Sequence, residues 1–255
     1  MIIRFAALFA LVCSLALAAP LGAADAPLVY LRDVDPSIAQ DIRYATKNNF
    51  TGSRVPGYLA GECLLLKPVA EMLKRAQATL KARGLSLKVY DCYRPQKAVD
   101  AFVAWAKASD TSSATKRFYP RTPKGELLKK GYIEPVSNHS RGIAVDVTLI
   151  IDGGDPAKPF DPLASYGGCI SPAAMRAPDN SLDMGTGYDC FDENAATNSR
   201  GIGPPQKKLR GALYEAMAKH GFRNYPGEWW HFALGGAEKA PILNIDVTPY
   251  PAKKP

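Results

Sequence analysis

Two histidines are the residues of this 255-residue sequence that are best suited to metal chemistry. His139 stands in the segment SNHSRGIAVD (137–146), a polar turn that leads into an apolar run carrying Asp146. His231 follows the sequence EWW, so an imidazole and the Glu228 carboxylate are embedded among aromatic residues. An aspartate within an apolar strand is costly to bury unless a charged group meets it. Either histidine alone is compatible with a hydrogen-bonded core position, so the chemistry depends on whether these residues meet.

Two imidazoles and one buried carboxylate are the number and type of ligands that a catalytic zinc uses when its fourth position is left for water. We therefore expect His139, Asp146 and His231 to bind one Zn²⁺ per chain, although the same set also suits cobalt or nickel. Glu228 would then lie beside the metal without being a ligand. It is the expected general base, because zinc lowers the pKa of its bound water towards about 7 and a nearby carboxylate can take the proton.

Arg94 is the candidate for stabilising the negative charge that develops when a carbonyl is attacked. It lies in the segment YDCYRP (90–95), at the end of a predicted strand and just before a helix. A fixed cation there would suit an oxyanion, whereas the alternative is a salt bridge that holds the turn. The third histidine, His220, precedes Gly221 at a helix end, where a cationic side chain meets the last carbonyls, and we interpret it as structural.

The elements that must position these residues follow from hydrophobic periodicity. Helical spacing of apolar residues predicts helices over residues 67–83, from Pro95 to about Ala106, and over 205–220. Apolar or β-branched runs predict strands over residues 85–93, 142–151 and 229–234. Because helices and strands are mixed without regular βαβ alternation, the pattern favours a single α+β domain over a doubly wound sheet.

The N-terminal segment has the pattern of a secretory signal peptide. A basic start at Met1–Arg4 is followed by a small and apolar run over residues 5–19, with a small-x-small cleavage site at Ala16-Leu17-Ala18 and a second choice at Gly22-Ala23-Ala24. We expect residues 1–24 to be removed and residues 25–255 to form the mature, exported domain. The apolar run is too short for a comfortable membrane span, so no membrane insertion is expected.

Composition and charge exclude several classes of protein. With 47% hydrophobic and 22% charged residues, the chain has the composition of a folded protein rather than a disordered one. The formal net charge of +8, or +7 once Arg4 leaves with the signal peptide, is spread thinly along the chain. A nucleic-acid footprint would cluster that charge, so no nucleic-acid partner is expected.

Four cysteines remain after Cys13 leaves with the signal peptide: Cys63, Cys92, Cys169 and Cys190. An even number in an exported chain predicts two disulfides. Four cysteines can form two disulfides in three ways. We prefer the way that joins the cysteines nearest in sequence, Cys63 with Cys92 and Cys169 with Cys190. A four-thiolate zinc site would need close Cys-x-x-Cys pairs, and the sequence has none.

Several further segments complete a recognisable pattern. They are DIRYAT (41–46), NFTG (49–52), YRPQ (93–96), SNHSRGIAVD (137–146), MGTGYD (184–189) and EWWH (228–231). These motifs extend over most of the mature chain, which resembles the zinc D-alanyl-D-alanine dipeptidases, close relatives of the zinc D,D-carboxypeptidases. The resemblance implies a hedgehog-like or D,D-peptidase-like fold, a small and mostly antiparallel sheet flanked by helices with the zinc site at the sheet.

The resemblance also implies a role for each matching residue. His139, Asp146 and His231 match the zinc ligands, Glu228 the catalytic base and Arg94 the transition-state stabiliser. Tyr44, Ser137 and Asp189 match the positions that hold the free amino end of the dipeptide. A carboxylate facing an ammonium suits that task, and such a clamp would restrict the enzyme to dipeptides.

Two segments depart from the family pattern or from regular structure. Residues 152–182 are rich in Gly, Pro, Asp and Ser and are longer than the family's usual link, so they could narrow or cap the cleft. The proline-rich end, residues 248–255, is expected to be extended or disordered. Cys92 and Cys190 are unusual at their places and fit a disulfide-bonded periplasmic version of the family.

These features lead to one expected function and two alternatives. We expect zinc-dependent hydrolysis of D-alanyl-D-alanine or a similar small D,D-dipeptide in the periplasm, in cell-wall peptide turnover or glycopeptide tolerance. The alternatives are a D,D-carboxypeptidase that acts on peptidoglycan stem peptides and a non-catalytic zinc module that binds cell-wall peptides. The sequence leaves the oligomeric state open.

Overall fold

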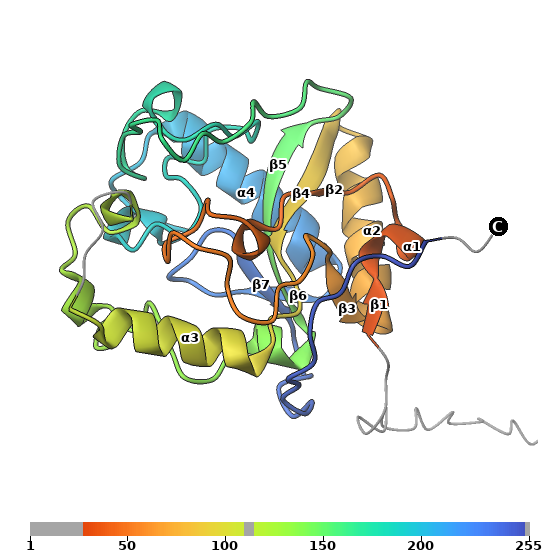
Figure 1. Cartoon of the computed structure of the whole chain (residues 1–255). Coiled ribbons are helices and arrows are strands. Elements are labelled where there is room, and N and C mark those ends of the chain that lie inside the picture. Colours follow the sequence, from red (N-terminus) through yellow and green to blue (C-terminus); the bar gives the residue numbers. More distant parts are fainter. Residues whose placement is uncertain (1–27, 110–114, 253–255) are drawn as a thin grey trace, which may run out of the picture.

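A computed structural model of the chain describes residues 28–109 and 115–252, and the predicted signal peptide lies outside them. The central sheet has five strands in the order β2-β4-β5-β7-β6 (Figure 1). Their bounds are β2 Ala39–Gln40, β4 Leu85–Asp91, β5 Ala144–Ile151, β6 Phe222–Asn224 and β7 His231–Leu234. β2 runs parallel to β4, and the other neighbouring pairs are antiparallel. A separate antiparallel pair joins β1 (Leu28–Tyr30) to β3 (Leu64–Leu66).

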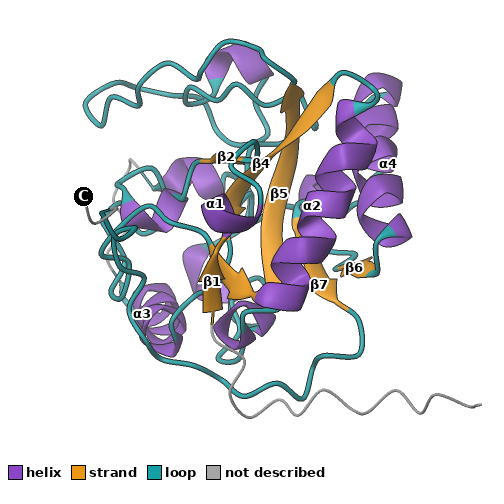
Figure 2. Ribbon diagram, turned by 90° about the vertical axis from the view of Figure 1, so that its right-hand side faces the viewer, coloured by secondary structure: helices purple, strands orange, loops and turns teal. Residues whose placement is uncertain are grey.

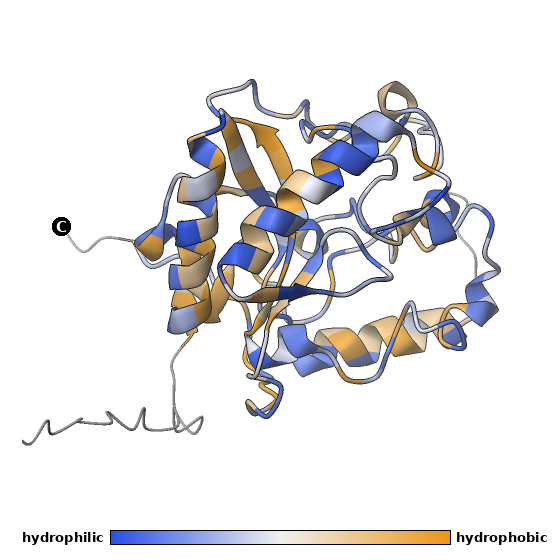
Figure 3. Cartoon of the chain, turned by 180° about the vertical axis from the view of Figure 1, so that it is seen from behind, coloured by the Kyte–Doolittle hydropathy of each residue, from blue (hydrophilic) through white to orange (hydrophobic). Residues whose placement is uncertain are grey.

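The α-helices in the described part of the chain are α1 (Leu31–Val34), α2 (Lys67–Lys81), α3 (Gln96–Lys107) and α4 (Pro204–Lys219). In Figure 2, α2 and α4 lie side by side on one side of the sheet, and α3 lies on the other. Figure 3 shows hydrophilic residues recurring along the outward sides of α2 and α4. Apolar residues of both helices, such as Leu73 and Leu213, are fully buried, which is the pattern of amphipathic helices packed on a sheet.

The predicted α+β architecture is confirmed, as are the three predicted long helices and three longer strands. The sheet is mostly antiparallel, as expected. The elements that periodicity did not predict are α1 and the strands β1, β2, β3 and β6, which have two to four residues each. Such short segments offer no complete repeat of a helical or strand pattern, so their formation depends on pairing with distant parts of the chain.

The register of the sheet sets one row of polar residues across its centre. β5 is buried along nearly its whole length, and within it Asp146 pairs with Asp91 of β4 on one side and with His231 of β7 on the other. A bulge in β4 between Val89 and Asp91 shifts the register there. Bulges re-aim side chains next to active sites, and here the bulge is followed directly by the Asp91 carboxylate.

The two disulfides have the pairing that was preferred from the sequence. Cys63 is bonded to Cys92, just beyond the end of β4, and Cys169 is bonded to Cys190. His220 follows α4, as predicted. Its Nε2 lies 2.8 Å from Thr79 Oγ1 of α2, so the imidazole ties two helices together instead of reaching the last carbonyls of α4.

Residues 152–182 form a long connection with a single short 3-10 turn, Ala173–Met175. Backbone hydrogen bonds hold it to the rest of the chain at both ends, from Asp152 N to Gly84 O and from Leu182 N to Leu149 O, and also at Cys169, whose N donates to Arg117 O. The described part of the C-terminal end, residues 248–252, is extended and contacts β1, with Tyr250 packed edge-on against Tyr30. Among the described residues, no helix is both long and apolar enough to cross a membrane.

Candidate metal centre and active site

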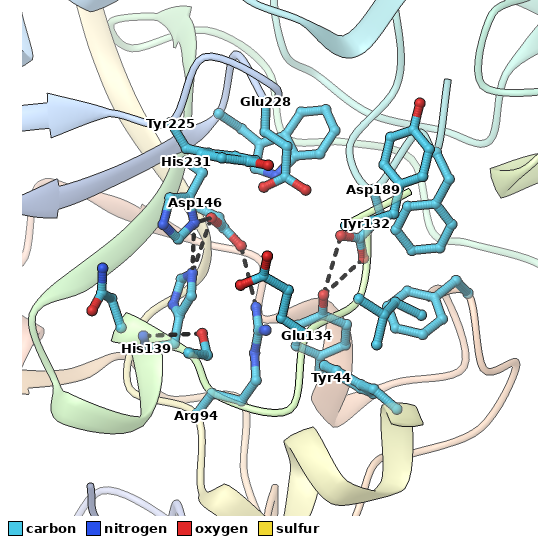
Figure 4. A pocket seen from close by; sticks show the side chains of 18 of the residues that line it. Tyr44, Arg94, Tyr132, Glu134, His139, Asp146, Asp189, Tyr225, Glu228 and His231 are labelled. Carbon is cyan, nitrogen blue, oxygen red and sulfur yellow. Dashed lines mark hydrogen bonds and ion pairs between the residues drawn. The ribbon is translucent and has the colours of Figure 1, made fainter. Parts of the chain in front are cut away.

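The three predicted metal ligands meet at the row where β5 pairs with β7. Asp146 Oδ1 lies 3.2 Å from His139 Nε2 and 3.1 Å from His231 Nδ1, and the two nitrogens are 3.0 Å apart. His139 and Asp146 are buried, and His231 is partly buried. Figure 4 shows the three side chains turned towards one another at one end of a cavity. The prediction that these residues come together is therefore confirmed.

A short turn presents His139 to the two strands. The 3-10 turn Asn138–Arg141 is capped by Ser137, whose Oγ accepts a hydrogen bond from His139 N. Gly142 ends the turn with φ of 69°, and a Cβ at that position would meet Leu28 Cδ2 at 2.6 Å. Only glycine combines this left-handed conformation with so close a neighbour. The turn thus delivers the imidazole just before β5 begins.

The contacts of His139 leave one ring nitrogen for a cation. Its Nδ1 donates a hydrogen bond of 2.6 Å to Cys92 O, so Nε2 is the ring atom that faces the Asp146 carboxylate and His231 Nδ1. The two ring nitrogens and the carboxylate oxygen that meet here are all of a kind that binds metal ions. Tetrahedral zinc with bonds of about 2.0–2.1 Å places ligand atoms about 3.3 Å apart, close to the separations seen here. The residues present fit a zinc ion.

Glu228 points into the cavity beside this triangle (Figure 4). It ends a turn in which Glu228 N donates to Tyr225 O, and only Trp229 and Trp230 separate it from β7. Burial, reinforced by the negative charge of Asp146, raises the pKa of its carboxyl to about 8. Once ionised, a carboxylate with a raised pKa is a stronger proton acceptor than an ordinary one, which suits a general base.

Arg94 lies at the opposite side of the metal triangle. Its Nε and Nη2 both lie 2.8 Å from Asp91 Oδ2, and Nη2 lies 3.6 Å from Asp146 Oδ2. The guanidinium also stacks over the rings of Tyr44 and Phe102, at 5.0 and 5.1 Å from their centres. The two sequence interpretations of Arg94 are therefore compatible, because the salt bridge that holds the turn also fixes a cation at the edge of the cavity.

Of the predicted amino-end residues, Tyr44 and Asp189 lie across the cavity from the two histidines (Figure 4), whereas Ser137 lies beside His139. Tyr44 OH donates to both carboxylate oxygens of Asp189, at 3.1 and 3.0 Å. Asp189 has φ of 55°, the one positive value for a non-glycine residue in the described part of the chain. Burial, together with the charge of Asp146, raises the pKa of Asp189 well above its usual range. Ser137 also lines the cavity, with its hydroxyl oxygen engaged in capping the turn of His139.

All eight predicted site residues line one cavity of about 350 Å³. Its wall includes residues that were not singled out from the sequence, namely Phe50, Phe102, Tyr132, Glu134, Phe191, Tyr225 and Trp230. Glu134 is labelled in Figure 4 among the residues that line the cavity, and in that view its carboxylate lies near Arg94. Its place three residues before Ser137 is a signal that could have drawn attention to it. Asp91, the partner of Arg94, belonged to the YDCYRP segment but was assigned no role.

The expectation that residues 152–182 could narrow or cap the cleft is wrong. All of these residues are described, and none lines the cavity. The physical reason is a buried cluster of charges elsewhere, since Asp179 forms ion pairs with Arg43 and Lys88. Those contacts hold the segment away from the mouth of the site.

Comparison with known proteins agrees with this geometry. A sequence model of the peptidase M15 family, described as D-ala-D-ala dipeptidase, matches residues 24–159 and 158–248. The chain is 32% identical to a D-alanyl-D-alanine dipeptidase of Enterococcus faecalis over 81% of its own length and 90% of that relative. It is 32% identical to one of Streptomyces coelicolor (80% and 90%) and 29% identical to one of Escherichia coli (85% and 89%). The chain therefore belongs to the D-Ala-D-Ala dipeptidase family of peptidases.

Proposed function

We propose that this protein is an exported, zinc-dependent dipeptidase that hydrolyses D-alanyl-D-alanine, or a similar small D,D-dipeptide, to free D-amino acids. The observation that carries this proposal is the single cavity that brings the ligand triangle, Glu228, Arg94 and the Tyr44–Asp189 pair together. The names of the relatives support the substrate. The signal-like N-terminus and the two disulfides support a periplasmic location, in cell-wall peptide turnover or glycopeptide tolerance.

The chain's own residues divide the work along the cavity. His139, Asp146 and His231 would hold Zn²⁺, which as a Lewis acid polarises a carbonyl and makes water a stronger nucleophile at neutral pH. Glu228 takes a proton from the attacking water and returns it to the leaving amine, so that no net proton is consumed by the residue. Arg94 supplies a fixed positive charge for the carbonyl oxygen, held ready by Asp91.

The opposite end of the cavity selects the substrate. Burial raises the pKa of Asp189, because the ionised carboxylate is poorly stabilised there. The ammonium group of a dipeptide placed against it would supply the stabilising positive charge. The hydroxyl of Tyr44 holds the carboxylate in place through its bonds to both oxygens. An acyl group on the substrate nitrogen would remove that charge, so blocked dipeptides and longer stem peptides would lose the interaction.

The test is the release of free D-alanine from three substrates, each with and without a zinc chelator. They are D-Ala-D-Ala, its N-acetylated form and an acyl-tripeptide ending in D-Ala-D-Ala. We expect cleavage of the free dipeptide alone, lost with chelator and restored by zinc. Cleavage of the blocked peptides would instead identify a D,D-carboxypeptidase, and cleavage of none would point to a binding module.

The proposed export has its own test. Expression of the full chain in a Gram-negative host, followed by osmotic release and mass spectrometry, gives the location and the N-terminus of the mature protein. We expect a periplasmic product that starts near residue 25 and carries two disulfides. A full-length product in the cytoplasm would contradict this part of the proposal.

A further inference from the structure

Tyr188 is a buried residue that contacts the ligand Asp146 from the side away from the histidines. Its hydroxyl donates a hydrogen bond of 2.8 Å to Asp146 Oδ2, whereas Oδ1 faces His139 and His231. The two carboxylate oxygens therefore have different partners. A hydrogen bond to an ionised carboxylate is stronger than one between neutral groups, so this contact fixes the rotation of the Asp146 carboxylate.

Tyr188 is itself held firmly by its neighbours. Its ring stacks on Tyr90, with centroids 4.5 Å apart and an interplanar angle of 18°, and it meets Trp230 edge-on at 5.5 Å. Its hydroxyl oxygen also lies 3.3 Å from that of Tyr44. The ring is thus fixed on two sides, and the hydroxyl lies between the metal end and the amino-end pair.

The stack continues to a partly buried cluster of charges, to which residues 152–182 contribute Asp179. Tyr90 OH donates to Asp179 Oδ2 at 2.7 Å, and the same oxygen pairs with Arg43 Nη2 at 2.7 Å. Lys88, only 3% exposed, pairs with the other carboxylate oxygen of Asp179. Removing one partner from such a cluster leaves the other charges uncompensated, so the position of Asp179 is well defined. Because Tyr90 OH is bonded to Asp179, the ring of Tyr90 is held in place as well.

We propose that Tyr188 is a positioning residue for the metal ligand Asp146, and that Asp179 of the 152–182 segment supports it from behind through the Tyr90 stack. The inference rests on the proposed metal function of Asp146. Residues that orient metal ligands typically change metal affinity or activity by about 10–100-fold when they are altered. Residues 152–182 then influence the binding of metal by Asp146 without lining the cavity.

The first test is Tyr188→Phe, which keeps the stacked ring and removes only the hydroxyl. Zinc affinity is measured by competition with a chromogenic chelator, and ligand geometry by the visible spectrum of the cobalt-substituted protein. We expect zinc to bind about 10–100-fold more weakly, the cobalt spectrum to change, and kcat to fall with little change in KM. Wild-type affinity together with a wild-type cobalt spectrum would overturn the proposal for Tyr188.

Tyr119→Phe is the matched control. Tyr119 is also buried, its hydroxyl lies 3.2 Å from Thr115 Oγ1, and it does not line the cavity. We expect its zinc affinity and cobalt spectrum to equal those of the wild type. An equal loss in this control would show that any buried tyrosine hydroxyl has the same effect, which would also overturn the specific role of Tyr188.

The second test addresses the segment. Tyr90→Phe keeps the ring and removes the hydroxyl that bonds to Asp179 and Ser181 of the segment, and Asp179→Asn removes the charge. Both variants should weaken zinc binding in the same direction as Tyr188→Phe but by only a few-fold. Wild-type zinc affinity in both would overturn the contribution of the segment. Thermal unfolding of each variant shows that it is folded, and Tyr90→Phe remains informative if Asp179→Asn does not fold.

These measurements separate this inference from the proposed function. Wild-type protein that binds zinc but cleaves no dipeptide would contradict the proposed function, while the comparison of zinc affinities and cobalt spectra would still decide the role of Tyr188. Wild-type protein that binds no zinc would overturn both.

Discussion

The two ends of the cavity are built in different ways. At the metal end, Asp146 and His231 occupy paired positions on neighbouring strands, so the pairing of the sheet sets their separation. At the amino end, Tyr44 lies on a short 3-10 turn and Asp189 has a left-handed backbone directly before the disulfide-bonded Cys190. The difference teaches that strand pairing can set the spacing of two ligands directly, whereas the amino-end pair is carried by irregular segments and lies next to a covalent crosslink.

The largest expected effect comes from the base at the metal end. Glu228→Gln should lower kcat by about 10²–10⁴-fold, because an amide cannot take the proton that general-base catalysis requires. Zinc affinity should stay close to that of the wild type, because Glu228 is not part of the ligand triangle. Steady-state kinetics and metal analysis on the same preparation check this, and a wild-type kcat would contradict the assigned role.

The two disulfides offer a direct test of the contrast between the ends. They span similar separations, 29 and 21 residues, so removing either should cost about 3 kcal/mol of unfolding free energy. Replacing Cys169 and Cys190 by alanine should also raise KM for the dipeptide and leave zinc affinity unchanged. Replacing Cys63 and Cys92 should weaken zinc binding instead, because Cys92 O accepts the hydrogen bond from His139.

Denaturant unfolding and zinc competition on these two double variants give the result. If both pairs affected KM and zinc affinity alike, the two ends would not be supported separately.

The amino-end pair is tested by Asp189→Asn. Loss of a charge-assisted contact with the substrate ammonium should lower kcat/KM for D-Ala-D-Ala by about 10–100-fold. Activity on the N-acetylated dipeptide, which lacks the ammonium, should be low in both proteins and nearly unaffected by the change. A variant with an equal loss on both substrates would show that Asp189 acts on catalysis in general rather than on the amino group.

The smallest effect concerns the support behind the metal end and depends on pH. The cations Arg43 and Lys88 hold the pKa of Asp179 well below its usual range. An ionised Asp179 therefore stabilises the fold above about pH 4, the pKa of an unfolded aspartate, and this contribution is lost as the pH falls towards the lowered value in the folded state. The stability difference between wild type and Asp179→Asn should shrink by about 1.4 kcal/mol for each pH unit below 4.

Urea unfolding of both proteins at pH 7, 5, 4 and 3 measures that difference. A gap that stays constant across this range would mean that ionisation of Asp179 does not stabilise the fold.

The sequence predicted the residues of the site better than the structure around them. His139, Asp146 and His231 stood out because polar ligands in apolar or aromatic surroundings need a partner, and that reasoning requires no knowledge of the fold. Asp91 and Tyr188 were within recognised motifs, but their roles depend on which residues they face. Strand register and ring stacking between distant segments decide that, and neither has a local signal in the chain.

Residues 152–182 show the same limit most clearly. Their length and composition predicted an irregular connection, which is correct, and a cover for the cleft, which is wrong. The direction in which a long segment folds back depends on contacts with distant residues. Here these include the ion pairs of Asp179 with Arg43 and Lys88, residues more than ninety positions away in the sequence.

The pairing of Asp146 with His231 also bears on how the chain reaches its native state. Side chains along a strand alternate between the two faces of a sheet, so a slip of one residue between β5 and β7 would send Asp146 to the opposite face. The metal-binding site would therefore form only when β5 and β7 are correctly paired. An ion that binds this arrangement and no other would stabilise it by mass action, so uptake of metal during folding would favour the correct alignment of the two strands.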